Sequence, residues 1–116
     1  MDIFKAGSAP TKLGPAEWFQ GTVWLDPVVS APAPARVSAN RVTCTPGART
    51  NWHTHPLGQT LHVLSGVGRV QKAGEPVCEI RVGDTVWLPP GEKHWHGSAA
   101  TWLEPVSEAD YTAKPA

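Results

Sequence analysis

The sequence predicts an all-β protein, built as a sandwich or a barrel of short strands. Its 116 residues are enough for one core, so we expect a single domain over residues 1–116. The 11 glycines and 12 prolines interrupt helices and are typical of a chain with many turns. From Asn40 onward, strand-sized runs alternate with turn signals such as Pro46-Gly47. Many short strands at close spacing favour a sandwich or a barrel.

The amino-terminal part of the chain, residues 1–20, is predicted to be an irregular arm because glycine and proline interrupt it repeatedly. Its Trp18 and Phe19 are expected to pack against the body of the domain. A first strand is expected at 22–25, ended by proline at position 27. Residues 31–34 are expected to be an extended loop, since a residue that precedes proline is forced out of the α region.

The remaining strands are expected where β-forming residues run between turn signals. They are 41–45, 51–55, 59–65, 67–72, 77–82, 85–88, 93–96 and 101–103. The runs 59–65 and 67–72 are predicted to pair as a hairpin around Gly66. Residues 40–103 then form the core of the domain, and residues 104–116 a polar tail.

Charge and composition exclude several classes of function. Ten basic and ten acidic residues give zero net charge, which excludes a general electrostatic attraction to nucleic acid or to an anionic membrane. No apolar run approaches the roughly 20 residues of a membrane span, and residues 1–20 lack a signal-peptide pattern, so we expect a cytoplasmic protein. Cys44 and Cys78 are expected to stay reduced there. The low share of charged residues, 17%, favours a homodimer or a larger homo-oligomer.

Four of the five histidines form two His-x-His pairs, His53/His55 and His94/His96. Residues two apart on a strand point to the same face, so each pair places two imidazoles on one side of its strand. Neutral imidazole is the commonest protein ligand for metals. If the two strands are neighbours, the rings converge, and the pattern predicts a metal site.

The spacing around the pairs is more specific. Residues 47–66 follow the pattern G(x)5HxH(x)3Q(x)6G, and residues 83–94 follow G(x)5PxG(x)2H. This pair of motifs resembles the signature of the cupins. The family usually has a glutamate where this chain has Gln59, and an asparagine where it has Ser98.

The resemblance implies a small antiparallel jelly-roll (cupin) barrel that binds one divalent metal ion. It implies His53, His55, Gln59 and His94 as the metal ligands. Three imidazoles and an amide are neutral, so the charge of the metal is not compensated and its Lewis acidity increases. The set also lacks the carboxylate of a 2-His-1-carboxylate iron oxygenase.

One branch of the family, the carboxymuconolactone-decarboxylase-associated cupins, has similar sequences in three segments. They are residues 18–27, 46–61 and 90–97. That branch includes small manganese-dependent hydroxynitrile lyases, so the resemblance implies manganese, with iron, nickel and zinc as further candidates, and a dimer. In the branch, another long strand with a histidine follows the second motif. This chain has about twenty residues fewer there and no histidine beyond His96. The open edge could be covered by a partner chain or by the amino-terminal arm, or the sequence could omit a stretch.

His96 shares the face of the ligands and is the only remaining candidate for a catalytic base. Alternation places a small, mostly apolar pocket beside the metal, formed by Asn40, Val42, Cys44, Leu61 and Val63. Such a pocket suits a small neutral or aromatic molecule. The function favoured is a metal-dependent lyase. An oxygenase with iron in the same site, and a non-catalytic cupin that binds metal or a small ligand, are the alternatives.

Overall fold

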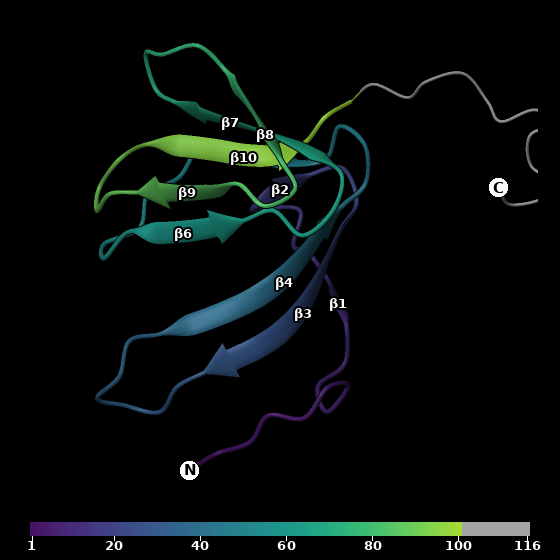
Figure 1. Ribbon diagram of the computed structural model, residues 1–116, viewed down its shortest axis with the longest axis vertical. Coiled ribbons are helices and arrows are strands. Elements are labelled where there is room, and N and C mark those ends of the chain that lie inside the picture. Colours follow the sequence, from purple (N-terminus) through teal and green to yellow (C-terminus); the bar gives the residue numbers. More distant parts are fainter. Residues whose placement is uncertain (101–116) are drawn as a thin grey trace, which may run out of the picture.

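The computed structural model describes residues 1–100 (Figure 1). The strand expected at 101–103 and the polar tail at 104–116 lie outside the described residues. Every regular element of residues 1–100 is a β-strand, and all strand pairs are antiparallel, as the sequence predicts. No helix within this part of the chain is long and apolar enough to cross a membrane.

The largest sheet has five strands in the order β2-β5-β10-β7-β8. They are β2 (Phe19–Gln20), β5 (Arg49–Thr50), β10 (His94–Ser98), β7 (Val67–Lys72) and β8 (Cys78–Arg81). The central strand, β10, pairs with β7 over its whole length, from His94 opposite Lys72 to Ser98 opposite Gly68. A side chain at Gly97 would collide with the backbone of β5, so the close approach of the two strands requires glycine there.

Two smaller sheets complete the fold. One has the order β1-β3-β4, formed by β1 (Lys12–Leu13), β3 (Val23–Ser30) and β4 (Ser38–Cys44). The other pairs β6 (Gln59–His62) with β9 (Thr85–Leu88). Figure 1 shows β6 and β9 lying between the five-stranded sheet and the β3–β4 hairpin. The two sequence motifs therefore meet in the middle of the molecule.

The hairpin predicted around Gly66 is wrong. β6 pairs with β9, while β7 pairs with β10 and β8. Hydrogen bonds from Val63 N to Asp84 O and from Gly83 N to Val63 O, both 3.0 Å long, continue the β6–β9 pairing up to the bend. The segment around Gly66 then carries the chain from one sheet into another, so sequence neighbours do not become partners.

Two further strand predictions need correction. The strand expected at 22–25 continues through Pro27 to Ser30, because the pairing with β4 shifts register between Pro27 and Val29. A bulge tolerates a proline that a regular ladder excludes. The strand expected at 51–55 is reduced to a single bridge between His53 and His94. The loop at 31–34 is present, but it is a turn and not an extended segment, because Ala35 N donates to Pro32 O at 3.1 Å.

The described core is small and lies against the histidines. Its buried apolar side chains are Val23, Ala48, Val70 and Leu88, and His94 is also buried, with 1% of its surface exposed. The arm contains the short strands β1 and β2, so it is more ordered than predicted. Its Phe19 is half-buried, but Trp18 is 60% exposed.

Candidate metal centre

Backbone hydrogen bonds join the two sequence motifs. His53 N donates to His94 O at 2.9 Å, and His94 N donates to His53 O at 3.0 Å. A third bond, from Gly91 N to His55 O, is 3.0 Å long. These three contacts fix the first histidine pair beside the second, although only the second pair lies on a regular strand.

The four side chains that the resemblance assigns as ligands lie around one point. The ring centroid of His53 is 4.9 Å from that of His55 and 4.3 Å from that of His94. The rings of His55 and His94 are 5.7 Å apart. Gln59, the first residue of β6, places its Oε1 3.0 Å from His94 Nε2.

Hydrogen bonds to backbone carbonyls orient two of the rings. His53 Nδ1 lies 2.8 Å from Asn51 O, and His94 Nδ1 lies 2.9 Å from Glu92 O. A carbonyl oxygen only accepts, so each Nδ1 carries the proton. The neutral ring then presents the lone pair of Nε2 toward the centre, which is the tautomer that a metal ligand needs.

The polar atoms of the centre fit a cation. The lone pair of His94 Nε2 faces the amide oxygen Oε1 of Gln59, so two acceptors point at each other. His55 Nε2 and His96 Nε2 are buried and have no hydrogen-bond partner among residues 1–100. Buried polar atoms without a partner are costly, and a metal ion at their centre removes that cost.

Burial disfavours the charged form of three of the rings, those of His55, His94 and His96. Burial is the largest cause that lowers the pKa of His55, and the rings of His53 and His94 lower it further. Burial also lowers the pKa of His94. For His96, burial and the three neighbouring rings lower the pKa to about 3. Neutral imidazole is the form that binds a metal.

His96 lies closer to the centre than the sequence pattern indicates. The ligating atoms of His53, His94 and His96 all lie within 4.8 Å of one another. Ring centroids of His96 are 5.6 Å from His53 and 6.0 Å from His94. These three histidines have the donor atoms and the spacing that could hold a metal ion. His55, which the resemblance implies as a ligand, does not belong to this group of three.

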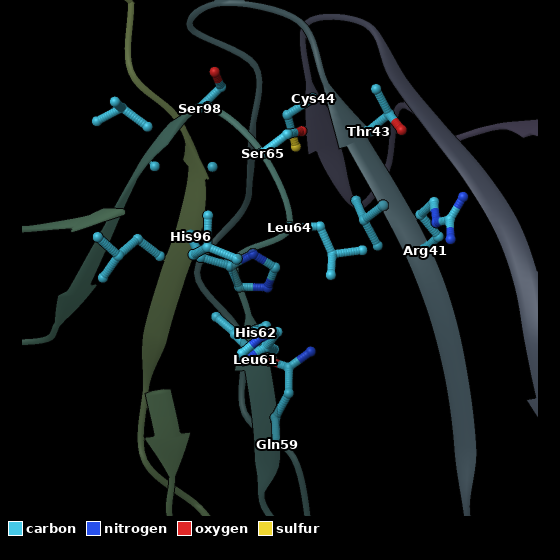
Figure 2. Close-up of a pocket in the computed structure, with 17 residues that line it drawn as sticks. Arg41, Thr43, Cys44, Gln59, Leu61, His62, Leu64, Ser65, His96 and Ser98 are labelled. Carbon is cyan, nitrogen blue, oxygen red and sulfur yellow. The ribbon is translucent and has the colours of Figure 1, made fainter. Parts of the chain in front are cut away.

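Two cavities adjoin the centre. One, of about 450 Å³, lies between the arm, β4 and the histidines, and its lining includes Asn40, Val42, Gln59 and His96. The other, of about 640 Å³, lies between β4 and the segment 61–68 (Figure 2). Val42, Gln59 and His96 line both cavities.

The structure divides the predicted pocket between these cavities. Asn40 lines only the smaller one, while Cys44, Leu61 and Val63 line only the larger one. Sequence reasoning missed four apolar side chains that line the smaller cavity, Trp18, Phe19, Leu25 and Trp52. No spacing rule relates the arm to the motifs, because β2 reaches the site only by pairing with β5.

Comparison with known proteins identifies the family. Residues 40–103 match the family described as Cupin domain. The chain belongs to the cupin family. It is similar to a solved cupin-like protein from Thermotoga maritima, with a TM-score of 0.74, 35% identity, and coverage of 96% of this chain and 95% of the other.

This cupin is also 57% identical to an (R)-mandelonitrile lyase from Granulicella tundricola, over 96% of this chain and 98% of the relative. That relative is an enzyme, a lyase. The aligned stretch of 129 positions is longer than the 116 residues of this chain. The relative therefore has residues that this cupin lacks.

Proposed function

We propose that this cupin is a metal-dependent hydroxynitrile lyase, which splits an aryl cyanohydrin of the mandelonitrile kind into an aldehyde and hydrogen cyanide. The observation that carries the proposal is the 57% identity to an (R)-mandelonitrile lyase over 96% of this chain. The histidine centre and the apolar cavity beside it supply the parts that such a reaction needs.

The smaller cavity suits the carbon skeleton of the substrate. Trp18 and Phe19 supply aromatic walls, Leu25 and Val42 supply aliphatic ones, and Asn40 adds one polar amide. Such a lining favours an aromatic ring with a short polar arm over a phosphate or a sugar. The polar arm then lies at the end of the cavity where His53, His55 and His96 gather.

We infer that the metal is held by His53, His55, Gln59 and His94. Support comes from the inward Nε2 atoms, the facing oxygen of Gln59 and the buried Nε2 of His55. A bound divalent metal supplies Lewis-acid polarisation of the substrate oxygen. Manganese is our proposal for the metal, from the resemblance to the manganese-dependent lyases; iron, nickel and zinc are the competitors.

We propose His96 as the proton acceptor. Its Nε2 is buried, has no partner among the described residues, and borders the substrate cavity. It takes the hydroxyl proton of the cyanohydrin, the oxygen electrons form the carbonyl bond, and the bond to cyanide breaks. The proton then passes from the ring to the cyanide that leaves, which restores the neutral imidazole.

The test is release of benzaldehyde from mandelonitrile, followed by absorbance, with protein stripped of metal and reloaded with manganese, iron, nickel or zinc in turn. We expect activity above the metal-free protein, and the highest activity with manganese. Absence of cleavage with every metal would exclude the lyase, and oxygen uptake with iron would favour an oxygenase.

The role of His96 is tested by His96→Ala. We expect turnover to fall by roughly 10²–10⁴-fold while the bound metal per chain is unchanged. Because His96 lies in the cluster with His53 and His94, loss of metal in this variant would make it a ligand instead. Full activity would place the base elsewhere.

We further propose a cytoplasmic homodimer or larger homo-oligomer, with the arm near Trp18 and Phe19 at the interface. The zero net charge and the exposed side chains of Trp18, Trp24 and Trp87 support association. Sedimentation at micromolar concentration tests the assembly, and a single monomer mass would contradict it. Cell fractionation tests the location.

A further inference from the structure

Asn51 forms hydrogen bonds on two sides, to the amino-terminal arm and to the histidine centre. Its Nδ2 donates to Glu17 O at 2.9 Å, and its backbone N donates to Trp18 O at 2.8 Å. On the other side, its carbonyl oxygen lies 2.8 Å from His53 Nδ1, which donates to it. One residue therefore contacts both the arm that supplies an aromatic wall and a ring that faces the centre.

A second amide and a guanidinium extend these contacts to β2. Gln20 Nε2 donates to Asn51 Oδ1 at 3.1 Å, and Arg49 Nη2 donates to Gln20 Oε1 at 2.9 Å. Arg49 Nη1 also donates to Gly47 O at 3.0 Å, so the guanidinium is itself oriented. The arm thus uses both ends of the Asn51 amide, the nitrogen as a donor and the oxygen as an acceptor.

The backbone alone holds this part of the arm over a short length. The ladder between β2 and β5 consists of two residue pairs, at positions 19 and 20 of the arm. A ladder this short is marginally stable by itself. It stops short of Glu17, where the side chain of Asn51 supplies the next hydrogen bond. The amide of Asn51 therefore extends the attachment of the arm beyond the strand.

The two aromatic side chains of the arm are held in different ways. Phe19 is half-buried and packs on Gly14, where an added Cβ would lie 2.7 Å from its ring. Trp18 is 60% exposed, so packing contributes less to its place in the wall of the smaller cavity. The position of Trp18 depends on its backbone, and Asn51 binds both its carbonyl oxygen and that of the preceding residue.

We propose that Asn51 is a positioning residue for the substrate, because its side-chain amide holds Trp18 in the wall of the smaller cavity. The proposal rests on the proposed lyase function. The bond to His53 comes from the backbone carbonyl of Asn51, which a change of side chain retains. The amide should therefore act on substrate binding and leave metal binding unchanged.

The first test compares Asn51→Ala with Gln71→Ala in the metal-loaded protein. Gln71 is the matched control, because its half-buried amide also donates to a backbone carbonyl, that of Glu75, and accepts from a side chain, Trp95 Nε1. It does not line the smaller cavity. Asn51→Ala should raise KM for mandelonitrile roughly five- to tenfold with kcat and bound metal unchanged, and Gln71→Ala should keep the parent KM.

Three results of this comparison would overturn the proposal. They are a fall in kcat at unchanged KM, loss of metal from Asn51→Ala, and an equal rise in KM in the control. Asn51→Asp keeps the size of the side chain and its acceptor for Gln20, but it replaces the donor to Glu17 O by a second acceptor. It should raise KM as well, and a parent-like KM in this variant would also overturn the proposal.

The second test asks whether Asn51 acts through Trp18. In a Trp18→Ala background, Asn51→Ala should raise KM by less than about twofold, because the side chain that the amide positions is already gone. Two independent effects would multiply instead. A KM equal to that product would overturn the proposal.

Hydrogen exchange on the full chain tests the contact with the arm without the lyase assay. In Asn51→Ala, the amides of residues 18–20 should exchange at least about tenfold faster than in the parent protein, because fewer bonds resist opening of the arm. Amides of β7 and β10 should exchange as in the parent. Parent-like exchange in the arm would overturn the proposal. Faster exchange of the arm in a protein that cleaves no mandelonitrile would support the contact and reject the lyase function.

Discussion

The histidine centre and the wall of the substrate cavity are held in different ways. The centre lies where two motifs are joined by reciprocal backbone bonds between His53 and His94, on and beside β10. The wall comes from β4 and the arm, and β4 is bonded to β3 alone among the described strands. The metal ligands thus lie within one bonded frame, whereas the β4 part of the wall belongs to another sheet. Changes in the wall should alter substrate binding without altering metal binding.

Removing a ligand should give the largest effect. His53→Ala should abolish both metal binding and lyase activity, because the ring holds its Nε2 toward the centre through the bond of Nδ1 to Asn51 O. Loss of a group that only orients a ligand costs 10–100-fold in metal affinity, so loss of a ligand should cost more than about 100-fold. Metal analysis and the benzaldehyde assay measure both. His62→Ala is the control, since this exposed histidine bonds Thr85 instead. If the His53→Ala protein kept its metal, His53 would not be a ligand and the centre would not be held as described.

In metal-free protein, the pH dependence of the unfolding free energy should report on the histidine centre alone. The pKa of His96 is lowered from 6.5 to about 3 in the folded chain, so the unfolded chain takes up the proton first as pH falls. Its contribution to stability is complete above pH 6.5 and is lost progressively as pH falls from 6.5 toward about 3.

Thermal unfolding across this pH interval measures the effect. His96→Leu should flatten the pH dependence, because the group that takes up the proton is gone. His62→Gln should leave it as in the parent protein. An unchanged slope in His96→Leu would mean that other groups determine the acid sensitivity.

A change in the wall should act on the substrate alone. Trp18→Ala should raise KM for mandelonitrile roughly tenfold with metal content unchanged, because it removes an aromatic wall of the cavity. Trp24→Ala is the matched control, since Trp24 is partly exposed on β3 and does not line the cavity. Loss of metal in Trp18→Ala would show that the wall and the centre are coupled.

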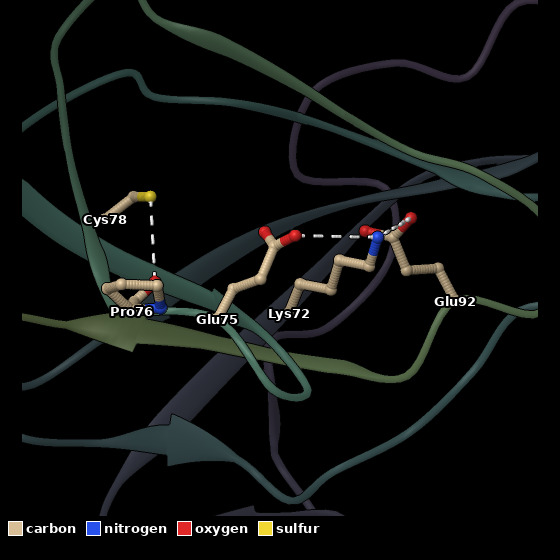
Figure 3. Close-up of polar contacts among 5 residues, drawn as sticks. All are labelled: Lys72, Glu75, Pro76, Cys78 and Glu92. Atoms are coloured by element: carbon tan, nitrogen blue, oxygen red, sulfur yellow. Dashed lines mark hydrogen bonds and ion pairs between the residues drawn. The ribbon is translucent and has the colours of Figure 1, made fainter.

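The smallest effect is expected at the exposed ion pairs of Lys72, the residue opposite His94 on β7. Lys72 lies 3.8 Å from Glu75 and 3.9 Å from Glu92, at the end of β7 (Figure 3). Half of the lysine side chain is exposed, so Lys72→Ala should cost less than about 1 kcal/mol of unfolding free energy and leave kcat and KM unchanged. Chemical unfolding measures the first and the lyase assay the second. A change in turnover would mean that Lys72 influences the centre through its pairing with His94.

Local patterns in the sequence determined the fold class and the gathering of the histidines. Turn residues and strand-sized runs predicted the strands at 67–72 and 85–88, which match β7 and β9. The resemblance of the two motifs to those of the cupins implied His53, His55, Gln59 and His94 as one ligand set, and the structure brings these side chains near one another.

Only the tertiary structure decided which strands pair and what surrounds the centre. The segment around Gly66 carries the chain into another sheet, so β6 pairs with β9, and pairing of that kind depends on packing between distant segments. The arm brings Trp18 and Phe19 to the cavity through the pairing of β2 with β5, which no sequence spacing encodes. A strand pattern fixes which face of a residue is buried, but not which neighbour completes its hydrogen bonds.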